Sequence, residues 1–423
     1  MVVLVRVLEG KNVRLERNPP RSHAFAAAFE PRTAFRPFIL AGDFSPPKSA
    51  NTKLHFEENF PFPPKTGNNQ PIKIKKKKRG VPVKFSVVGI QHPHIYGMTS
   101  ELVAHGAELV SAYDSDKTAL DAFVKKYRGV KAARCEEEIL EDKTVQLVAG
   151  AAVTSERADI GIRTMNAGKD YFTDKGPFTS FEQLERVKQT VKQTGKKYMV
   201  CYSERLQNSS AEMAGMMIKR GDIGKVVQVV SMGPHRLNAK SRPEWFWQKE
   251  KFGGILDDIC SHQFEQFLYF TGADKASVVS ARVENFAHPE YPEFEDFGEA
   301  SLVADNGASG YVKVDWFTPD GLDTWGDGRA FVIGTDGYIE LRKTIDICGR
   351  PGANHLFVTT NKQKTTYVDA NSFGHPFFDA FIKDCQERTE NAMTQEHVWE
   401  SARLTLEAQQ KADEFRKKLK NML

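Results

Sequence analysis

The spacing of hydrophobic and polar positions changes twice along this chain of 423 residues. Residues 1–80 show no sustained period, and ten prolines interrupt any long helix or strand there. Residues 81–204 alternate short apolar strands with helical patterns, which indicates a parallel sheet with helices on both faces. Residues 205–423 contain successive strands without intervening helices, which indicates a large, mostly antiparallel sheet. We therefore predict a disordered arm followed by two α/β domains with these bounds.

The same pattern predicts the elements of each domain. In the first domain we expect strands at 85–89, 107–113, 144–153, 170–173 and 197–202, and helices at 116–127, 157–168 and 181–195. In the second we expect strands at 226–233, 276–285, 298–304, 309–316, 330–334, 337–341 and 356–360, and helices at 209–220, 254–271, 377–385 and 396–419. The chain has no uncharged apolar run of about 18 residues, so no membrane-spanning helix is expected.

The turn after the first strand carries part of a dinucleotide-binding fingerprint. That fingerprint, G-x-G-x-x-G, lets the backbone approach a diphosphate, and only its first glycine, Gly89, is present. Gln91 and His94 stand at the later glycine positions. Amides at a helix N-terminus still bind anions, and His92 or His94 can donate to phosphate. The alternative is that both histidines only make polar contacts at the start of the helix.

Asp114 strengthens the dinucleotide interpretation. It ends the second strand, 25 residues after Gly89, and an acid that binds the adenosine ribose is expected about 20 residues on. A carboxylate there repels a 2′-phosphate, which favours NAD over NADP, although an aspartate in a turn is also common. The candidate cofactor-binding residues are Gly89, Ile90, Gln91, His92, His94, Asp114 and Lys175.

Three residues are candidates for catalysis. Lys175 follows the strand at 170–173, and strand carboxyl ends face the ligand crevice in open α/β sheets. Asp258 and His262 are four residues apart in an expected helix and therefore share a face. An acid paired with a histidine can tune it for general acid–base work. A structural ion pair or a divalent metal would suit the same spacing, but two ligands are too few to predict a metal.

Polar and aromatic residues near the expected rim are candidates for substrate binding. Tryptophan faces suit the C–H faces of sugars, and arginine or histidine suits hydroxyls and carboxylates. The segment 315–328 is rich in glycine and aromatic residues, so we expect it to line the pocket. The candidates are Arg205, His235, Arg236, Trp316, Trp325 and Arg329, with His235 favoured.

From about residue 83 onwards the chain resembles the Gfo/Idh/MocA oxidoreductases, the superfamily of glucose–fructose oxidoreductase and inositol dehydrogenase. The most specific match is Gly-Gly-x-x-x-Asp-x-x-x-His at 253–262, after an aromatic stretch at 245–247. The other matching segments occur in the family's order. They are 87–89 with Asp114, 168–175, 223–226 and 334–340.

This resemblance implies a Rossmann domain, then an α/β domain with a large, mostly antiparallel sheet. It also implies hydride transfer between NAD(P) and a hydroxyl-bearing carbon of a sugar, cyclitol or related polyol. In that picture His262 takes the hydroxyl proton, Lys175 stabilises the alkoxide, and Asp258 orients the substrate or tunes the pair. The chain departs from the family's E-K-P motif, because Gly176 separates Lys175 from Pro177.

Charge and cysteine content add expectations about location and partners. Residues 1–79 carry 16 of the 59 basic and 6 of the 55 acidic side chains, so a basic arm precedes an acidic body. We expect this arm to be a solvated linker that the fold does not need, rather than a nucleic-acid contact. Five scattered cysteines without C-x-x-C favour a reducing, cytoplasmic compartment over a disulfide framework. Edge strands of an exposed sheet tend to pair or be covered, and the family that the chain resembles commonly buries this sheet between subunits, so we expect a homo-oligomer. We also expect a small-molecule substrate and no membrane partner.

Other functions remain open on the same fold. Some relatives oxidise a sugar transiently with bound NAD and achieve glycoside cleavage or lyase-type chemistry. Other relatives are non-catalytic ligand sensors. A metal-dependent isomerase that uses Asp258 and His262 is the last alternative. The leading prediction is an NAD(P)-dependent dehydrogenase that acts on CH–OH groups.

Overall fold

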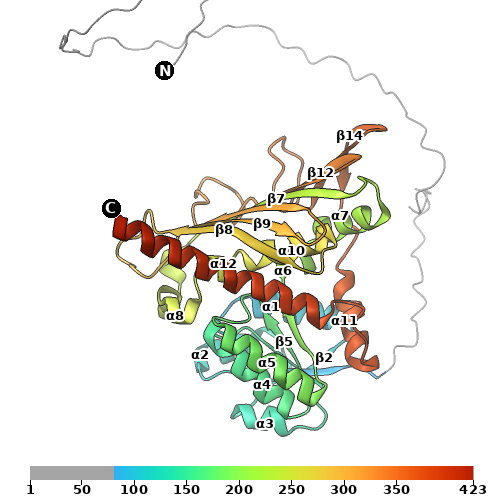
Figure 1. Cartoon of the computed structure of the whole chain (residues 1–423). Coiled ribbons are helices and arrows are strands. Elements are labelled where there is room, and N and C mark those ends of the chain that lie inside the picture. Colours follow the sequence, from blue (N-terminus) through green and yellow to red (C-terminus); the bar gives the residue numbers. More distant parts are fainter. Residues whose placement is uncertain (1–80, 423) are drawn as a thin grey trace, which may run out of the picture. The chain divides into compact units, whose positions relative to one another are not determined.

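The computed structural model describes residues 81–422, so the arm predicted at 1–80 lies outside the described residues. The described chain contains two sheets with helices packed against them (Figure 1). Within the range 81–422, no helix combines the length and apolar character that crossing a membrane requires.

The first sheet has six parallel strands, and the alternating pattern predicts all of them except the two-residue strand β3. Along the sheet they are β3 (Lys131–Ala132), β2 (Glu108–Tyr113), β1 (Lys84–Val88), β4 (Leu147–Gly150), β5 (Asp170–Asp174) and β6 (Tyr198–Cys201). The chain order reverses between β1 and β4. In such sheets the ligand crevice lies outside the carboxyl ends of the strands at this reversal.

Helices join these strands and cover the sheet. Asp116 caps α2 by accepting from the Thr118 amide at 2.8 Å, and Ser180 caps α5 by accepting from the Gln183 amide at 3.2 Å. In Figure 1, α4 and α5 lie side by side on one face. The helices are α1 (His94–Ala104), α2 (Lys117–Lys126), α3 (Glu136–Glu141), the short η1 (Thr154–Glu156), α4 (Arg157–Asn166) and α5 (Phe181–Thr194).

The second sheet has eight strands and is antiparallel except where β7 pairs with β10. Along the sheet they are β14 (Gln363–Asp369), β13 (His355–Thr360), β12 (Gly337–Arg342), β11 (Arg329–Gly334), β7 (Val226–Pro234), β10 (Ser309–Asp315), β9 (Phe297–Ala304) and β8 (Ala276–Glu284). The sequence pattern predicts this sheet but misses β14, whose side chains are all partly or fully exposed. Without a buried alternation, that strand gives no period to detect.

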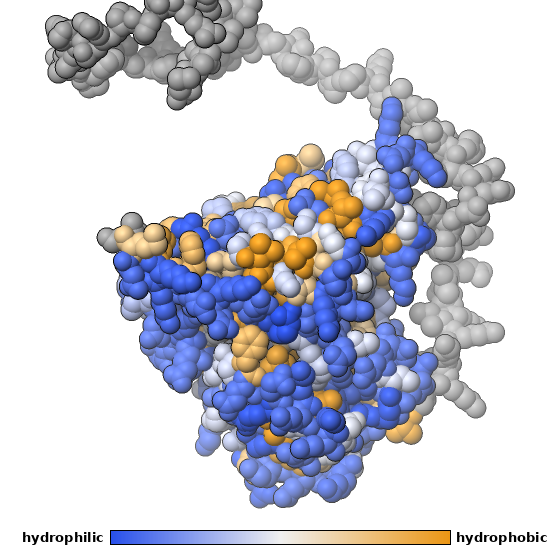
Figure 2. Space-filling view, viewed as in Figure 1, coloured by the Kyte–Doolittle hydropathy of each residue, from blue (hydrophilic) through white to orange (hydrophobic). Residues whose placement is uncertain are grey.

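Helices cover one face of the second sheet and fill the connections to the first. They are α6 (Ser203–Leu206), α7 (Ser209–Arg220), η2 (Ala239–Ser241), η3 (Glu244–Trp247), α8 (Lys249–Phe252), α9 (Ile255–Asp258), α10 (Ser261–Thr271), α11 (Pro376–Glu387) and α12 (Gln395–Met422). Exposed apolar side chains remain on several strands, including Val227, Val303, Tyr311, Ile333 and Tyr338. Figure 2 shows apolar patches in the upper part of the described surface, whereas the lower part is mostly hydrophilic.

The C-terminal helices contribute to the cores of both sheets. Phe377, Phe381 and Trp399 pack into the core around the first sheet, whereas Leu404 and Ala408 belong to the core around the second. The first core is therefore built from both ends of the described chain. The domain boundary between residues 204 and 205 stays a prediction.

Gln395, at the start of α12, completes the hydrogen bonding of the edge strand β6. Its side-chain oxygen accepts from the Tyr198 amide, and its side-chain nitrogen donates to the Tyr198 carbonyl, both at 2.9 Å. Tyr198 is fully buried, so water cannot replace either bond. This one side chain therefore closes the edge of the sheet in place of a seventh strand.

We expect Gln395→Ala to lower the free energy of unfolding by about 1–3 kcal/mol, because two buried backbone groups lose their partners. The measurement is the midpoint of urea unfolding. Gln410→Ala, on the exposed side of the same helix, is the matched control and should change stability by less than about 0.5 kcal/mol. Equal effects of the two substitutions would contradict this assignment.

Candidate functional site

A cavity of about 350 Å³ lies at the carboxyl ends of β1 and β2. It brings together three predicted cofactor-binding residues, Gly89, Gln91 and Asp114. Gly89 has a φ of +86°, and a Cβ there would lie 2.6 Å from the Cβ of Ala152. The single surviving fingerprint glycine is therefore required for the turn to approach β4. The remaining lining residues are Val88, Tyr113, Ser115, Glu136, Ala152, Glu156, Asp159, Ile160 and Arg163.

Asp114 ties the turn after β1 to the end of β2. Its carboxylate accepts from the Ile90 amide at 2.5 Å, from Gln91 Nε2 at 3.0 Å and from the Asp116 amide at 2.7 Å. Burial raises the pKa of Asp114, and the two amide bonds oppose that shift. Ile90, a predicted cofactor contact, thus binds Asp114 through its backbone. The carboxylate lines the cavity, as a ribose-binding acid must.

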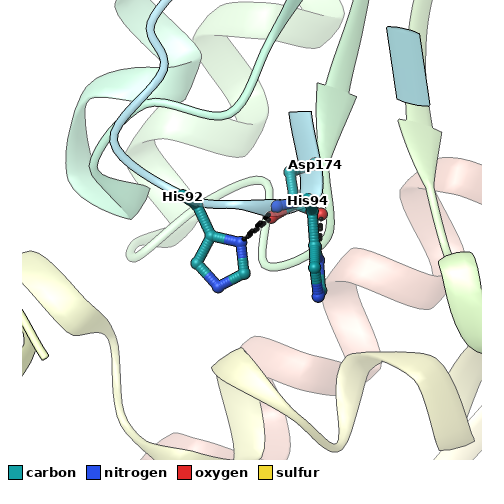
Figure 3. A group of neighbouring side chains, drawn as sticks. All are labelled: His92, His94 and Asp174. Atoms are coloured by element: carbon teal, nitrogen blue, oxygen red, sulfur yellow. Dashed lines mark hydrogen bonds and ion pairs between the residues drawn. The ribbon is translucent and has the colours of Figure 1, made fainter. Parts of the chain in front are cut away.

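Asp174 holds both histidines of the turn, as Figure 3 shows. His92 Nδ1 lies 3.2 Å from one carboxylate oxygen, and His94 Nδ1 lies 2.9 Å from the other. Burial lowers the pKa of His92 to about 3. The backbone amide of His94 also points to His92 Nδ1, at 3.3 Å. Both histidines therefore make the polar contacts at the helix start that the sequence left as an alternative to phosphate binding.

The same three side chains could be considered as metal ligands. One atom from each of His92, His94 and Asp174 lies within 4.8 Å of the others. However, the buried guanidinium of Arg157 lies 3.5 Å from Asp174, and Lys175 follows in sequence. These positive charges oppose a further cation, so we assign the cluster to holding the turn.

Lys175 and Asp258 form a buried ion pair that joins the domain of the first sheet to the domain of the second. Lys175 follows β5 and Asp258 ends α9, and each side chain is less than one-tenth exposed. The Lys175 ammonium donates to Asp258 Oδ1. Burial alone would raise the pKa of Asp258, but Lys175 and then His92 outweigh it and lower the pKa to about 2. The sequence placed both residues in the site, and the structure brings them into direct contact.

The predicted pairing of Asp258 with His262 needs correction. The helix expected at 254–271 is broken, because the Cys260 amide points five residues back to the Ile255 carbonyl and the His262 amide points three back to Ile259. Asp258 and His262 therefore lie on different helices, α9 and α10, and Asp258 contacts Lys175 instead.

His262 is neutral at pH 7, and one of its ring nitrogens lacks a hydrogen-bond partner among the described residues. Its side chain is 1% exposed, and its Nδ1 has no hydrogen-bond partner among the described residues. Burial lowers the pKa of His262 to about 3, against an opposing effect of Glu204. Because Lys175 also acts on this pKa, the two predicted catalytic residues lie in one electrostatic environment. A buried orphan nitrogen of this kind indicates a group that a ligand or water satisfies.

A second buried ion pair, Glu204 with Lys343, escaped the sequence prediction. Lys343 Nζ donates to Glu204 Oε2 at 2.5 Å, and Gln263 Nε2 donates to the same oxygen at 2.8 Å. Glu204 follows β6, so its position at the carboxyl end of a parallel strand is a signal that could have identified it. Lys343 follows β12 of the other sheet and carries no such signal.

His235 lies beside this pair, together with two of the predicted tryptophans. Its Nε2 is 3.6 Å from Glu204 Oε1, and its ring centroid is 5.5 Å from Trp316 and 4.5 Å from Trp325. Burial lowers the pKa of His235 to about 4, despite the opposing charge of Glu204. Trp325 is 47% exposed, whereas Trp316 is buried. The structure thus brings His235, Trp316 and Trp325 together, as the sequence predicts.

The guanidinium groups of the three predicted arginines all contact protein groups. Arg205 is buried, and its guanidinium is taken by Glu212 and Glu265 while it stacks on Tyr269. The guanidinium of Arg236 donates to the carbonyls of Pro319 and Leu322. Arg329 pairs with Asp327. These partners are not visible in the sequence, and the predicted contact of these arginines with substrate stays a prediction.

Comparisons with known proteins agree with this geometry. Residues 83–202 match an oxidoreductase family described by its NAD-binding Rossmann fold, and residues 212–340 match the GFO/IDH/MocA C-terminal domain. A crystal structure of an inferred oxidoreductase from Erwinia carotovora atroseptica is 45% identical, with a TM-score of 0.76. That alignment covers 78% of this chain and 98% of the other.

Two curated relatives have named activities. The scyllo-inositol 2-dehydrogenase (NAD⁺) of Bacillus subtilis is 29% identical over 55% of this chain, and the D-xylose dehydrogenase of Paenarthrobacter nicotinovorans is 25% identical over 45%. The chain spans 66% and 48% of the lengths of these two proteins.

The buried neutral histidines predict how stability depends on pH. His92, His235 and His262 have folded pKa values of about 3, 4 and 3, below the value of about 6.5 in an unfolded chain. Between those values the unfolded chain binds protons that the folded chain does not. The free energy of unfolding should therefore fall as pH drops from 6.5 towards 4, by up to about 1.4 kcal/mol per pH unit for each histidine.

Urea unfolding at a series of pH values measures this slope. His262→Gln removes one of the three protons, so it should flatten the slope between pH 6.5 and 4. A wild-type slope in that variant would show that His262 is accessible to protons in the folded chain.

Proposed function

The chain belongs to the Gfo/Idh/MocA family of oxidoreductases, and from this membership we propose that it is a dehydrogenase of a sugar, cyclitol or related polyol. The observation that carries the proposal is the buried Lys175–Asp258 pair next to a neutral His262 with an unpartnered Nδ1. The inositol and xylose dehydrogenases among the relatives support this substrate class.

The residues of the first cavity suit NAD. Gly89 allows the close backbone approach, and the Asp114 carboxylate lines the space in which an adenosine ribose would offer two hydroxyls. Glu156 and Asp159 add negative charge to the lining, while Arg163 is engaged by Glu136 at 2.8 and 2.9 Å. A 2′-phosphate would meet several carboxylates and no unpaired cation of this lining. We therefore propose NAD rather than NADP as the cofactor.

The site residues would divide the chemistry between a base and a charged anchor. Bound NAD supplies the hydride acceptor. His262 is neutral at pH 7, so it can take the proton of a substrate hydroxyl. The Lys175 ammonium can stabilise the oxygen that loses this proton, and Asp258 fixes the position of that ammonium. Burial of all three excludes water and strengthens each of these interactions.

Location and assembly extend the same proposal. The cysteines within residues 81–422 are free, as expected for a protein of a reducing compartment such as the cytoplasm. The exposed apolar side chains on the strands of the second sheet form a surface that a homo-oligomer would bury. We propose both features as properties of the active protein.

The cofactor assignment is tested by fluorescence titration of the full chain with NADH and NADPH. NADH should bind in the micromolar range and more tightly than NADPH. Asp114→Ala removes a charged acceptor, so it should weaken NADH binding roughly tenfold or more and reduce the preference over NADPH. Asp121→Ala, at an exposed position of α2, is the control and should bind like the wild type. No binding of either nucleotide would refute the cofactor assignment.

The catalytic assignment is tested by NADH formation with scyllo-inositol and D-xylose as probes. His262→Gln should lower kcat by about 10²–10⁴, because the variant lacks the base, while the Kd for NADH stays within threefold. His288→Gln, in the connection between β8 and β9, should retain full activity. Product without net NADH would instead indicate transient oxidation followed by cleavage. Unchanged kcat in His262→Gln would remove this residue from the mechanism.

A further inference from the structure

One oxygen of the buried Glu204 carboxylate lacks a hydrogen-bond donor. Lys343 and Gln263 both donate to Oε2, whereas Oε1 is buried and has no hydrogen-bond partner among the described residues. Burial would raise the pKa of Glu204, but Lys343 and the nearby histidines lower it to about 2. The group is therefore an anion at neutral pH, and its unsatisfied oxygen is costly unless a ligand or water donates to it.

The His235 ring beside this oxygen does not supply that donor. His235 Nδ1 lies 3.1 Å from the Gly233 carbonyl, which can only accept, so Nδ1 carries the proton. With a pKa of about 4 the ring is neutral at pH 7, and its Nε2 is then a lone pair. This lone pair faces Glu204 Oε1 at 3.6 Å. Two hydrogen-bond acceptors thus face each other, and no donor to either is found among the described residues.

This pair of acceptors belongs to the proposed reaction centre. The charge of Glu204 acts on both His235 and His262, and the charge of Lys175 acts on the same two rings. Trp325 lies against His235 and is 47% exposed, so the His235 end reaches the surface. A ligand whose reacting hydroxyl lies at His262 would extend towards His235 and Glu204.

We infer that Glu204 Oε1 and His235 Nε2 together bind hydroxyl donors of the substrate, at carbons beyond the one that is oxidised. The inference rests on the proposed function and narrows its substrate class to polyols that carry further hydroxyls and no carboxylate. Each hydroxyl can donate one hydrogen bond, and two of them satisfy both acceptors. A carboxylate of a sugar acid offers no hydrogen and adds a negative charge beside Glu204, so the same pair rejects it.

Charge balance around the site agrees with a neutral ligand. Lys175 is balanced by Asp258 and Lys343 by Glu204, while His235 and His262 are neutral at pH 7. Both lysines are therefore paired, and the guanidinium of Arg242, which stacks on Trp316, donates to the Leu237 carbonyl. The selectivity therefore comes from unsatisfied acceptors rather than from net charge.

Calorimetric titration of the full chain with NADH bound tests the inference without requiring turnover. The probes are scyllo-inositol, D-xylose and D-glucuronate. We expect at least one neutral polyol to bind tenfold or more tightly than D-glucuronate to the wild type. Glu204→Gln keeps the shape but removes the charge, so it should weaken binding of that polyol about tenfold and bring the discrimination within threefold.

Two further variants separate binding from folding. Glu204→Gln leaves Lys343 buried without its anion, whereas Glu204→Gln with Lys343→Met removes both charges and should show the same loss of polyol binding. Glu299→Gln is the matched control, because Glu299 bonds to Tyr311 on an exposed part of the second sheet. It should bind every probe like the wild type.

The outcomes distinguish this inference from the proposed function. Polyol binding that depends on Glu204, in a protein that forms no NADH, supports the inference and refutes the dehydrogenase. NADH formation with polyol affinity unchanged within twofold in both Glu204 variants overturns the inference and leaves the dehydrogenase. Equal affinity of the wild type for D-glucuronate and the polyols also overturns it.

Discussion

The buried ion pair between Lys175 and Asp258 is the contact on which the site depends. It joins the end of a parallel strand to a short helix beside the antiparallel sheet, so it sets the position of one domain's chemistry relative to the other's. Removing either partner would leave a charge buried without a counter-ion, which is strongly destabilising. The Glu204–Lys343 pair joins the same two parts of the chain a second time. The two parts are thus joined by two buried ion pairs as well as by the apolar packing of the C-terminal helices.

In the turn after β1, side-chain hydrogen bonds hold the backbone where the glycine fingerprint is incomplete. Two of the usual glycines are absent, and polar side chains hold the backbone instead. Asp114 accepts from the Ile90 amide, while Asp174 fixes His92 and His94. Gly89 alone is kept, at the one position where a Cβ would collide with Ala152. Hydrogen bonds and ion pairs to Asp114 and Asp174 therefore fix the backbone of this turn. The histidines near the start of α1 contribute by contacting Asp174.

Local spacing was enough to predict most strands of both sheets, and it identified three candidate site residues. Lys175 was predictable because strand carboxyl ends face the crevice, and Asp258 and His262 because the chain carries a specific glycine-acid-histidine spacing. The break between α9 and α10 was not predictable from spacing. It arises because the Cys260 and His262 amides donate to carbonyls five and three residues back instead of four. Glu204 and Lys343 are 139 residues apart, and only folding joins them. For the same reason the sequence does not reveal the partners of Arg205, which are Glu212 and Glu265.

The arrangement of charges explains why the site can be both stable and reactive. Lys175 and Lys343 each have a buried carboxylate partner, which holds these four charged groups in position. Burial keeps His235 and His262 neutral at pH 7, because its effect on their pKa values exceeds that of Glu204. Among the described residues, His262 Nδ1 and Glu204 Oε1 have no hydrogen-bond partner. Buried polar atoms without a partner cost free energy, and a hydrogen-bond donor that reached them would recover it. Burial thus keeps His262 neutral and leaves these acceptors without a partner, and both effects depend on the exclusion of water from the site.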